Sequence, residues 1–123
     1  MIAGVADTHA ALWHLFDDKR LSGPAGDLID QAAASGNRIA VSAISLAEIV
    51  YLIEKNRLPS SAYDDLRRAL SDPGYVLEEA PLTIRDAVPD MPDRIIAATA
   101  VYFGVPVISR DNRIRTSSVR TIW

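Results

Sequence analysis

The sequence predicts one α/β domain of three layers, in which helices cover both faces of a central, mainly parallel sheet of four or five strands. Short apolar runs alternate with stretches of helical periodicity along the chain, which is typical of strands joined through helices. Such crossovers make the strands parallel. The 123 residues suffice for one core, and no repeat, linker or shift in composition divides them. We therefore expect residues 1–123 to form a single domain.

The first half of the chain is predicted to hold two strands and three helices. Ile2–Ala6 and residues 39–41 are short apolar runs of the kind found in buried strands. The helices are expected at about residues 10–16, 24–33 and 45–55. Pro24 suits the first turn of the second helix, and Gly36 suits the position just beyond its end. Each strand is thus followed by a helix, as parallel pairing requires.

The second half continues this alternation. A fourth helix is expected to start at a cap on Ser60 or Ser61 and to end at Leu70. Strands are expected at residues 75–77, at residues 105–108 and, as a short edge strand, at residues 119–123. Between them we expect a short helical piece at residues 83–87 and a longer helix at residues 93–103.

Composition limits the possible functions. The 13 Lys and Arg residues face 16 Asp and Glu, and the net charge of −3 argues against a simple basic arm for nucleic acid. Cysteine is absent, which excludes zinc–thiolate sites, thiol catalysis and disulfides and fits a reducing compartment. The N-terminal residues carry neither a basic start nor a long apolar run, so we expect no signal peptide, no membrane span and a cytoplasmic protein.

Four acidic residues stand where open α/β sheets bind ligands, beyond the carboxyl ends of strands or at helix starts. Asp7 follows the first strand, and Asp111 follows the strand at residues 105–108. Glu48 lies in the first turn after the second strand, and Asp93 opens the helix at residues 93–103. We expect all four carboxylates to meet at one end of the sheet.

Converging carboxylates raise one another's pKa unless a cation lies between them. The chain has only two lysines, so a divalent cation is the obvious partner, and oxygen donors without cysteine select Mg²⁺ or, alternatively, Mn²⁺. Such a metal can polarise a phosphate oxygen and activate water. The sequence therefore predicts a catalytic metal site built from Asp7, Glu48, Asp93 and Asp111.

Each of these acids also has an ordinary structural interpretation. Ser45-x-x-Glu48 fits a capping box, in which Glu48 accepts from the Ser45 backbone N–H. Asp93 could stabilise a helix N-terminus, and Asp111 could form an Asx turn. Asp7 is the hardest to explain in this way, because strands disfavour Asp. Independent caps and turns need not gather at one end of a sheet, and convergence therefore favours a functional site.

Four short motifs follow one another along the chain. They are Asp7-Thr8-His9, Ser45-Leu46-Ala47-Glu48, Asp93-Arg94-Ile95-Ile96-Ala97-Ala98-Thr99-Ala100 and Ser109-Arg110-Asp111. Their order and spacing resemble a PIN domain and, more closely, the VapC toxins of bacterial type II toxin–antitoxin modules. Each motif alone is weak, but the resemblance runs essentially from end to end.

The resemblance implies a PIN-like fold and an Mg²⁺-dependent endoribonuclease that cleaves structured RNA, either tRNA or rRNA, and is neutralised by a cognate VapB antitoxin. By position, Asp7 and Asp93 match the family's principal metal ligands. Glu48 and Asp111 match two supporting acids that often act through water. Many of these toxins carry another Asp in an Asp-Pro-x-Asp-Arg run; here the proline stands one place later, so Asp90 is not assigned to the site.

Substrate contacts are expected from hydroxyl and arginine side chains near these acids. Relatives often carry Thr where Ser109 stands, and a hydroxyl there can touch a phosphate. Thr8 can cap the following helix and still orient the acid before it. Arg110, Arg113 and Arg115 lie near the C-terminus beside a single acid and can grip phosphate bidentately, although each can equally be a solvated surface charge.

The remaining aromatic and apolar residues point to partners. We expect a homodimer, and the apolar helices at residues 12–16 and 46–53 could furnish its contact or a groove for an antitoxin helix. Trp13 is interpreted as a core or dimer residue, and His9 as a substrate contact at most.

Three rival functions suit a small α/β domain with an acidic site. A phosphoacceptor receiver needs paired acids after strand one and a late lysine, but a single Asp follows strand one and both lysines precede residue 56. A haloacid-dehalogenase-like phosphatase needs Asp-x-Asp where this chain has Asp7-Thr8-His9. A PIN-like RNA-binding or interaction module without catalysis stays open as the alternative, and the presence of all four acids favours the enzyme.

Overall fold

The computed structural model describes residues 1–81, 91–111 and 119–123, with residues 91–94 described by their backbone alone. The expected helical piece at residues 83–87, Asp90, Arg113 and Arg115 therefore lie outside the described residues. Within the described part, no helix is both long and apolar enough to cross a lipid bilayer.

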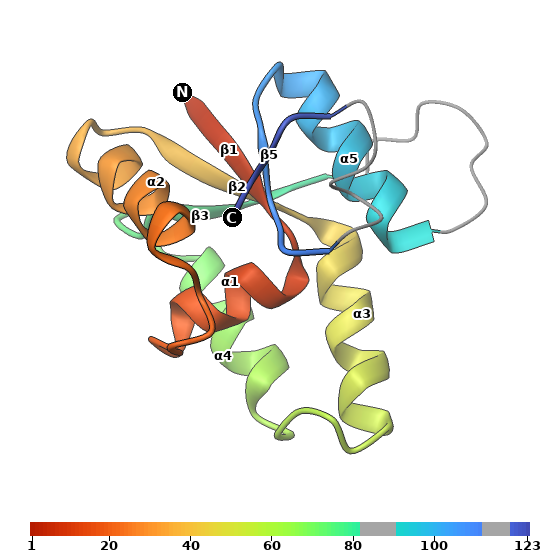
Figure 1. The fold of residues 1–123 in the computed structure, drawn as a ribbon. Coiled ribbons are helices and arrows are strands. Elements are labelled where there is room, and N and C mark those ends of the chain that lie inside the picture. Colours follow the sequence, from red (N-terminus) through yellow and green to blue (C-terminus); the bar gives the residue numbers. More distant parts are fainter. Residues whose placement is uncertain (82–90, 112–118) are drawn as a thin grey trace.

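Five parallel strands form the sheet of the described chain, which confirms the predicted sheet (Figure 1). They are β1 (Ile2–Ala6), β2 (Arg38–Ser42), β3 (Leu77–Ala80), β4 (Val107–Ile108) and β5 (Thr121–Ile122). Their spatial order is β3-β2-β1-β4-β5, so β1 lies at the centre. β5 is the short edge strand expected at residues 119–123.

Helices cover both faces of the sheet, which confirms the three-layer α/β/α architecture (Figure 1). On one face Ile29 of α2 (Gly23–Ala34) packs in a buried cluster with Ile39 and Val41 of β2. On the other face Ile96 of α5 (Met91–Phe103) packs in a cluster with Val5 of β1. Successive strand residues point to opposite faces, so both sides of the sheet are apolar.

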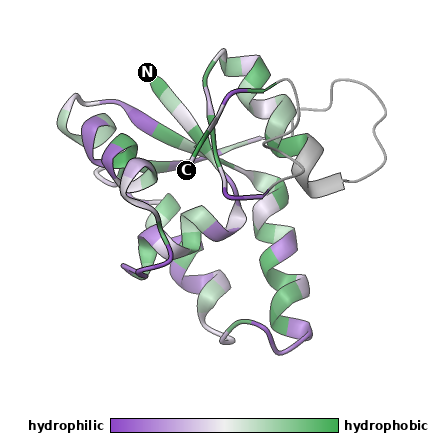
Figure 2. Cartoon of the chain, viewed as in Figure 1, coloured by the Kyte–Doolittle hydropathy of each residue, from purple (hydrophilic) through white to green (hydrophobic). Residues whose placement is uncertain are grey.

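Three further helices pack against one another beyond the carboxyl end of the sheet. They are α1 (Thr8–Leu15), α3 (Ala43–Glu54) and α4 (Ala62–Leu70). Leu12, Leu46, Ile49 and Leu66 form the buried centre of this cluster. In Figure 2, hydrophobic residues follow the strands, whereas hydrophilic residues mark the outer side of α2 and the loops at the helix ends. The helix cluster fixes how α1 meets α3, and this contact positions the site.

Several element boundaries differ from the sequence prediction. α3 begins at Ala43 rather than at Ser45, because Ser42 is its N-cap and accepts a hydrogen bond from the Ile44 N–H (3.3 Å). The predicted cap position of α4 is confirmed at Ser61, although the Ser61 side chain makes no cap hydrogen bond. α5 begins at Met91, which leaves Pro92 in its first turn, where proline is tolerated.

β3 was also misplaced by the prediction, which put a strand at residues 75–77. Tyr75 instead closes a turn, in which its N–H donates to the Asp72 carbonyl (3.1 Å). The strand starts at Leu77 and carries two glutamates, Glu78 and Glu79. A strand at the edge of a sheet tolerates such charges, because one side of it faces solvent.

Candidate active site

The carboxyl ends of β1 and β4 lie side by side at the point where the strand order reverses. The chain runs outward from β1 through β2 to β3 and then returns to β4 on the other side of β1. The Asp7 N–H donates to the Ile108 carbonyl (3.1 Å), so the residues that follow the two strands remain neighbours. Open α/β sheets bind their ligands at such switch points.

Asp7 is the N-cap of α1. Its backbone is extended (φ −73°, ψ 175°), and its Oδ1 accepts a hydrogen bond from the Ala10 N–H at 2.9 Å. Thr8 is the first helical residue and is buried, so the expectation that Thr8 caps this helix is wrong. The strand ends one residue before Asp7, which makes Asp7 the first residue able to cap. The carboxylate is thereby fixed by the helix that it starts.

The Asp7 carboxylate lies in a largely desolvated position. Burial is the main reason why the pKa of Asp7 is raised above its usual value. A hydrogen bond with the Ser109 side chain, the Ala10 N–H and the charge of His9 each act to lower the pKa, whereas the nearby Glu48 carboxylate raises it. Asp7 and Glu48 are thus close enough for their negative charges to repel each other, and a cation between them would relieve this repulsion.

Glu48 reaches this position through a buried hydroxyl network. The Thr8 Oγ1 lies 2.5 Å from Glu48 Oε1 and 2.9 Å from Ser45 Oγ. A hydroxyl has a single proton and a carboxylate only accepts, so Thr8 donates to Glu48 and its oxygen can accept from Ser45. Glu48 and Ser45 stand one turn apart on α3 and face the same residue of α1.

The capping-box interpretation of Glu48 is therefore wrong. α3 starts two residues before Ser45, so Ser45 lies inside the helix rather than at its cap. Both Ser45 and Thr8 are buried, and Glu48 is partly buried. Sequence reasoning missed Ser45 as a member of the site. Its spacing of three from Glu48 was the available signal, but the same spacing defines a capping box.

Ser109 and Asp111 extend the site on the β4 side. Ser109 is fully buried, and its Oγ accepts a hydrogen bond from the Asp111 N–H at 3.0 Å. The same side chain hydrogen-bonds with Asp7, so one hydroxyl ties the loop after β4 to the acid after β1. Asp111 is partly buried in this loop.

The predicted convergence of four acids is met only in part by the residues that the structure describes. Asp7 and Glu48 come together, whereas no three acidic or histidine side chains of the described chain form a metal-binding group. Asp93 lies in the first turn of α5, and its side chain is outside the described residues. The helix contacts β1 and α3, the elements that carry Asp7 and Glu48. Participation of Asp93 and Asp111 stays a prediction.

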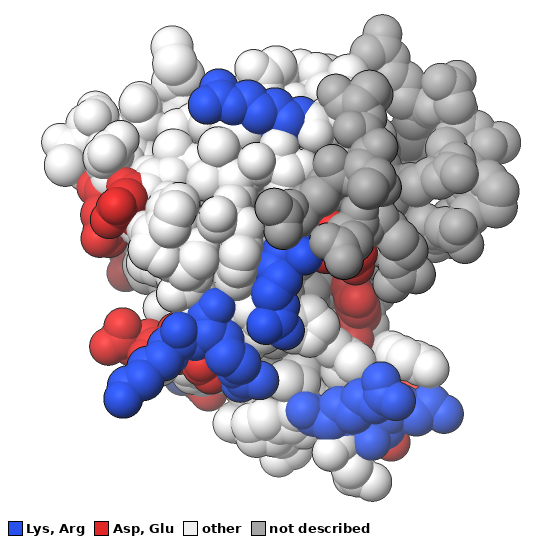
Figure 3. All heavy atoms as spheres, viewed as in Figure 1, with Lys and Arg blue, Asp and Glu red and all other residues white. Residues whose placement is uncertain are grey.

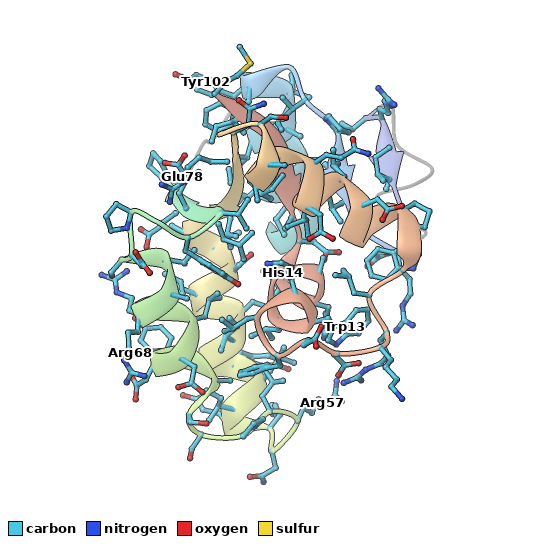
Figure 4. All side chains as sticks on the ribbon, turned by 90° about the vertical axis from the view of Figure 1, so that its left-hand side faces the viewer. Trp13, His14, Arg57, Arg68, Glu78 and Tyr102 are labelled. Atoms are coloured by element: carbon cyan, nitrogen blue, oxygen red, sulfur yellow. The ribbon has the colours of Figure 1, made fainter. Side chains whose placement is uncertain are left out.

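Arg110 borders the site in an arrangement that the sequence did not predict. Its guanidinium Cζ lies 4.7 Å above the ring of Trp13, and the residue is exposed. Trp13 itself is buried, as expected of a core residue. Figure 4 places Trp13 on the side of α1 that faces away from Arg68 on α4. Figure 3 shows the basic side chains of this face in separate groups with acidic side chains between them.

A parallel sheet of this order, sandwiched by helices and carrying partly buried acids at its switch point, defines an α/β/α domain with a candidate ligand site. The chain belongs to the PIN domain family, whose model matches residues 5–118. It is 29% identical to ribonuclease VapC22 of Mycobacterium tuberculosis, over 94% of this chain and 92% of that protein.

A solved structure confirms the fold. The crystal structure of VapBC2 from Rickettsia felis, bound to a DNA fragment from its promoter, contains a chain that matches with a TM-score of 0.64. The match covers 98% of this chain and 97% of that chain at 18% sequence identity. The likeness at this level of identity concerns the fold alone.

The donor set of the site fits a hard divalent cation. Two carboxylates and the hydroxyls of Thr8, Ser45 and Ser109 supply only oxygen atoms. Oxygen donors in a partly desolvated setting suit Mg²⁺ or Mn²⁺ rather than zinc or copper. A cation there would also offset the burial that raises the pKa of Asp7.

Proposed function

We propose that this protein is an Mg²⁺-dependent endoribonuclease of the VapC type, which hydrolyses phosphodiester bonds in structured RNA, either tRNA or rRNA. The observation that carries the proposal is the pairing of Asp7 and Glu48 at the switch point of a PIN fold. The similarity to a protein named a ribonuclease supports the same conclusion. Mn²⁺ is the alternative metal.

In this proposal Asp7 and Asp93 hold the metal, and Glu48 and Asp111 support it through water. Bound there, the metal would polarise the scissile phosphate and lower the pKa of a water molecule. Thr8 keeps Glu48 in one orientation by donating to its Oε1. The α1 cap fixes Asp7, whose carboxylate cannot rotate without losing the bond from the Ala10 N–H.

Ser109 has two tasks in this mechanism. It binds Asp7 through its side chain and holds the loop after β4 by accepting from the Asp111 N–H. Its position between two proposed ligands makes it suited to orient them, and Arg110 beside it is suited to hold the phosphate of the substrate. Arg113 and Arg115 are proposed to extend this contact.

The proposed partners follow from the relatives. One is a chain of a VapBC complex, so we propose a VapB-like antitoxin for this chain, a homodimer as its assembly and the cytoplasm as its location. Val50 and Tyr51 expose apolar surface on α3, within the helix region where an antitoxin or dimer contact was expected.

The test is cleavage of total RNA by the purified protein with Mg²⁺ and with EDTA. Asp7→Asn preserves the helix cap, since Asn caps as well as Asp, but removes the charge that would bind the metal. We expect this variant to lose cleavage, whereas Asp64→Asn, an exposed acid on α4, should cleave like the wild type. Cleavage in EDTA, or undiminished cleavage by Asp7→Asn, would contradict the proposal and favour a different reaction or a binding module.

A further inference from the structure

The indole of Trp13 is almost fully covered, although two of the groups that cover it are charged. The guanidinium Cζ of Arg110 lies 4.7 Å from the ring centroid and that of Arg20 lies 4.9 Å from it. The rings of His9 and Trp123 have centroids 5.6 Å from that of Trp13. Only 6% of Trp13 is exposed. The indole therefore acts as a platform on which two cations are held by cation–π attraction.

The two arginines on this platform differ in what else they bind. Arg20 is locked to Asp18, with Nε 3.1 Å from Oδ1 and Nη2 2.7 Å from Oδ2. Its charge is therefore matched by a carboxylate. Arg110 is exposed and, within the described part of the chain, has no carboxylate partner. Arg20 therefore has a structural role beside Trp13. The N–H donors and the charge of Arg110 are not matched by a carboxylate of the described residues and can bind a ligand.

Arg110 also stands at the edge of the candidate active site. It follows Ser109, whose side chain hydrogen-bonds with Asp7. A guanidinium group is planar and has two faces, of which Trp13 occupies one. Because the side chain is already stacked, binding a ligand costs less rotamer entropy than ordering a free arginine. A preorganised cation that pairs with no carboxylate of the described residues, next to the candidate active site, is suited to bind a segment of the substrate strand.

We propose that Arg110, held on Trp13, binds an unpaired nucleotide of RNA next to the bond that is cut. This inference rests on the proposed ribonuclease function. The N–H groups of Arg110 donate to a phosphate, and its outer face stacks against the base. A base inside a duplex has both faces covered by its neighbours, so only an unpaired base can take this position. The stack of Arg110 on Trp13 thus selects for an unpaired nucleotide at this position.

The test measures binding separately from cleavage. Every protein carries Glu48→Gln, and the buffer contains EDTA, so that the RNA stays intact. The probe is a fluorescent RNA of about ten nucleotides without self-pairing, used alone and annealed to its complement. The variants are Arg110→Ala, Arg110→Lys and, as a matched loss of one positive charge, Arg68→Ala on α4, which is exposed and far from Trp13 (Figure 4). Thermal unfolding checks that each variant is folded.

We expect Arg110→Ala to bind the single strand at least about fivefold more weakly, since stacking of one base contributes about 1–3 kcal/mol. Arg110→Lys keeps the charge but not the planar stack, so most of the loss should persist. Arg68→Ala should bind within about twofold of the parent, because a single surface charge remote from the site contributes little. The loss for Arg110→Ala should be smaller with the duplex.

Three results would overturn the inference. They are absence of RNA binding by the parent, parental affinity of Arg110→Lys, and an equal loss of single-strand and duplex binding in Arg110→Ala. Cleavage by proteins with intact Glu48 separates this inference from the function on which it rests. If the wild type cuts RNA and Arg110→Ala binds normally, only the inference fails. If the wild type cuts no RNA, the proposed function fails whatever the binding result.

Discussion

The Thr8 hydroxyl lies 2.5 Å from Glu48 Oε1 and joins the first turn of α1 to the middle of α3. These residues are 40 positions apart in the sequence. Thr8 is buried, and its Oγ1 also lies 2.9 Å from the buried Ser45 Oγ. Glu48 is therefore held by groups that are themselves fixed in the core. We infer that Thr8 is a positioning residue, which acts on the site through Glu48.

Thr8→Val should reduce cleavage by about tenfold or more, because loss of an outer partner typically weakens a metal site by that amount. Valine has nearly the shape of threonine but cannot donate to Glu48. Thr8→Ser keeps the hydroxyl and should restore most of the activity, which a purely packing role would not predict. The measurement is kcat/KM on one RNA substrate.

Thr99→Val provides the matched control for Thr8→Val. Thr99 is also fully buried, but its hydroxyl bonds only the Ile95 carbonyl within its own helix (2.7 Å). Its activity should stay near that of the wild type. Equal losses in Thr8→Val and Thr99→Val, or no rescue by Thr8→Ser, would show that the hydroxyl of Thr8 has no specific role.

The arrangement of strands and helices could be predicted from periodicity, because alternating apolar runs and helical stripes determine which faces are buried. Asp7 was also predictable as a site residue, since it directly follows a buried strand. The Glu48 environment was not. A local pattern, Ser45-x-x-Glu48, fits a helix cap as well as an interhelical contact, and the choice depends on where α3 starts. That start is set by Ser42 and by the packing of α1 on α3.

The stack of Arg110 on Trp13 lies beyond sequence reasoning for a similar reason. The two residues are far apart in the chain and meet because β1 and β4 are adjacent in the sheet. The sequence shows that arginines are plentiful near the C-terminus. Only the tertiary structure distinguishes an arginine stacked on an indole from a solvated one. Adjacency of strands is decided by the order of the sheet, which local periodicity does not contain.

His14 should make the stability of the fold sensitive to mild acid. Burial lowers the pKa of His14 below 6.5, and the nearby Asp30 and Asp17 oppose this only in part. The unfolded chain therefore binds a proton that the folded chain resists. The stability associated with neutral His14 is complete above about pH 6.5 and is lost as the pH falls through the lowered folded pKa.

Urea unfolding of the wild type and of His14→Gln would measure this effect. The series should run from about pH 5 to pH 8, the range in which histidine titrates. We expect the free energy of unfolding of the wild type to fall more steeply toward pH 5 than that of His14→Gln. The His14 ring also packs against Tyr75, with centroids 5.8 Å apart, so the variant should lose some stability at every pH. Parallel pH profiles would show that His14 is not the group responsible.

Asp7→Asn should raise the melting temperature at neutral pH. Burial raises the pKa of Asp7 above 3.8, so the folded state holds its proton more tightly than the unfolded state. The stability associated with protonated Asp7 is present below that value and is lost as the pH rises, which leaves a buried carboxylate at pH 7. Asparagine keeps the cap without the charge.

The gain in melting temperature from Asp7→Asn should shrink as the pH falls, because the Asp7 carboxyl of the wild type then becomes protonated and loses its charge as well. Asp64→Asn, which changes an exposed acid in the first turn of α4, should show no gain at any pH. Scanning calorimetry over a pH series in EDTA distinguishes the two variants. A lower melting temperature for Asp7→Asn at neutral pH would mean that hydrogen bonds from Ala10 and Ser109 outweigh the desolvation of the carboxylate.

Mg²⁺ should stabilise the wild type, since a ligand that binds only the folded state raises the stability of that state. It should stabilise Asp7→Asn much less, because this variant lacks the carboxylate proposed to bind the cation. At saturating Mg²⁺ we expect a rise in melting temperature of about 5 °C or more for a domain of this size. Asp93→Asn should show the same deficit if its carboxylate joins Asp7 in the site. Thermal scans against KCl of equal ionic strength separate specific binding from screening. An equal Mg²⁺ response in wild type and Asp7→Asn would remove Asp7 from the metal site, because charge at that position is what the cation is expected to bind.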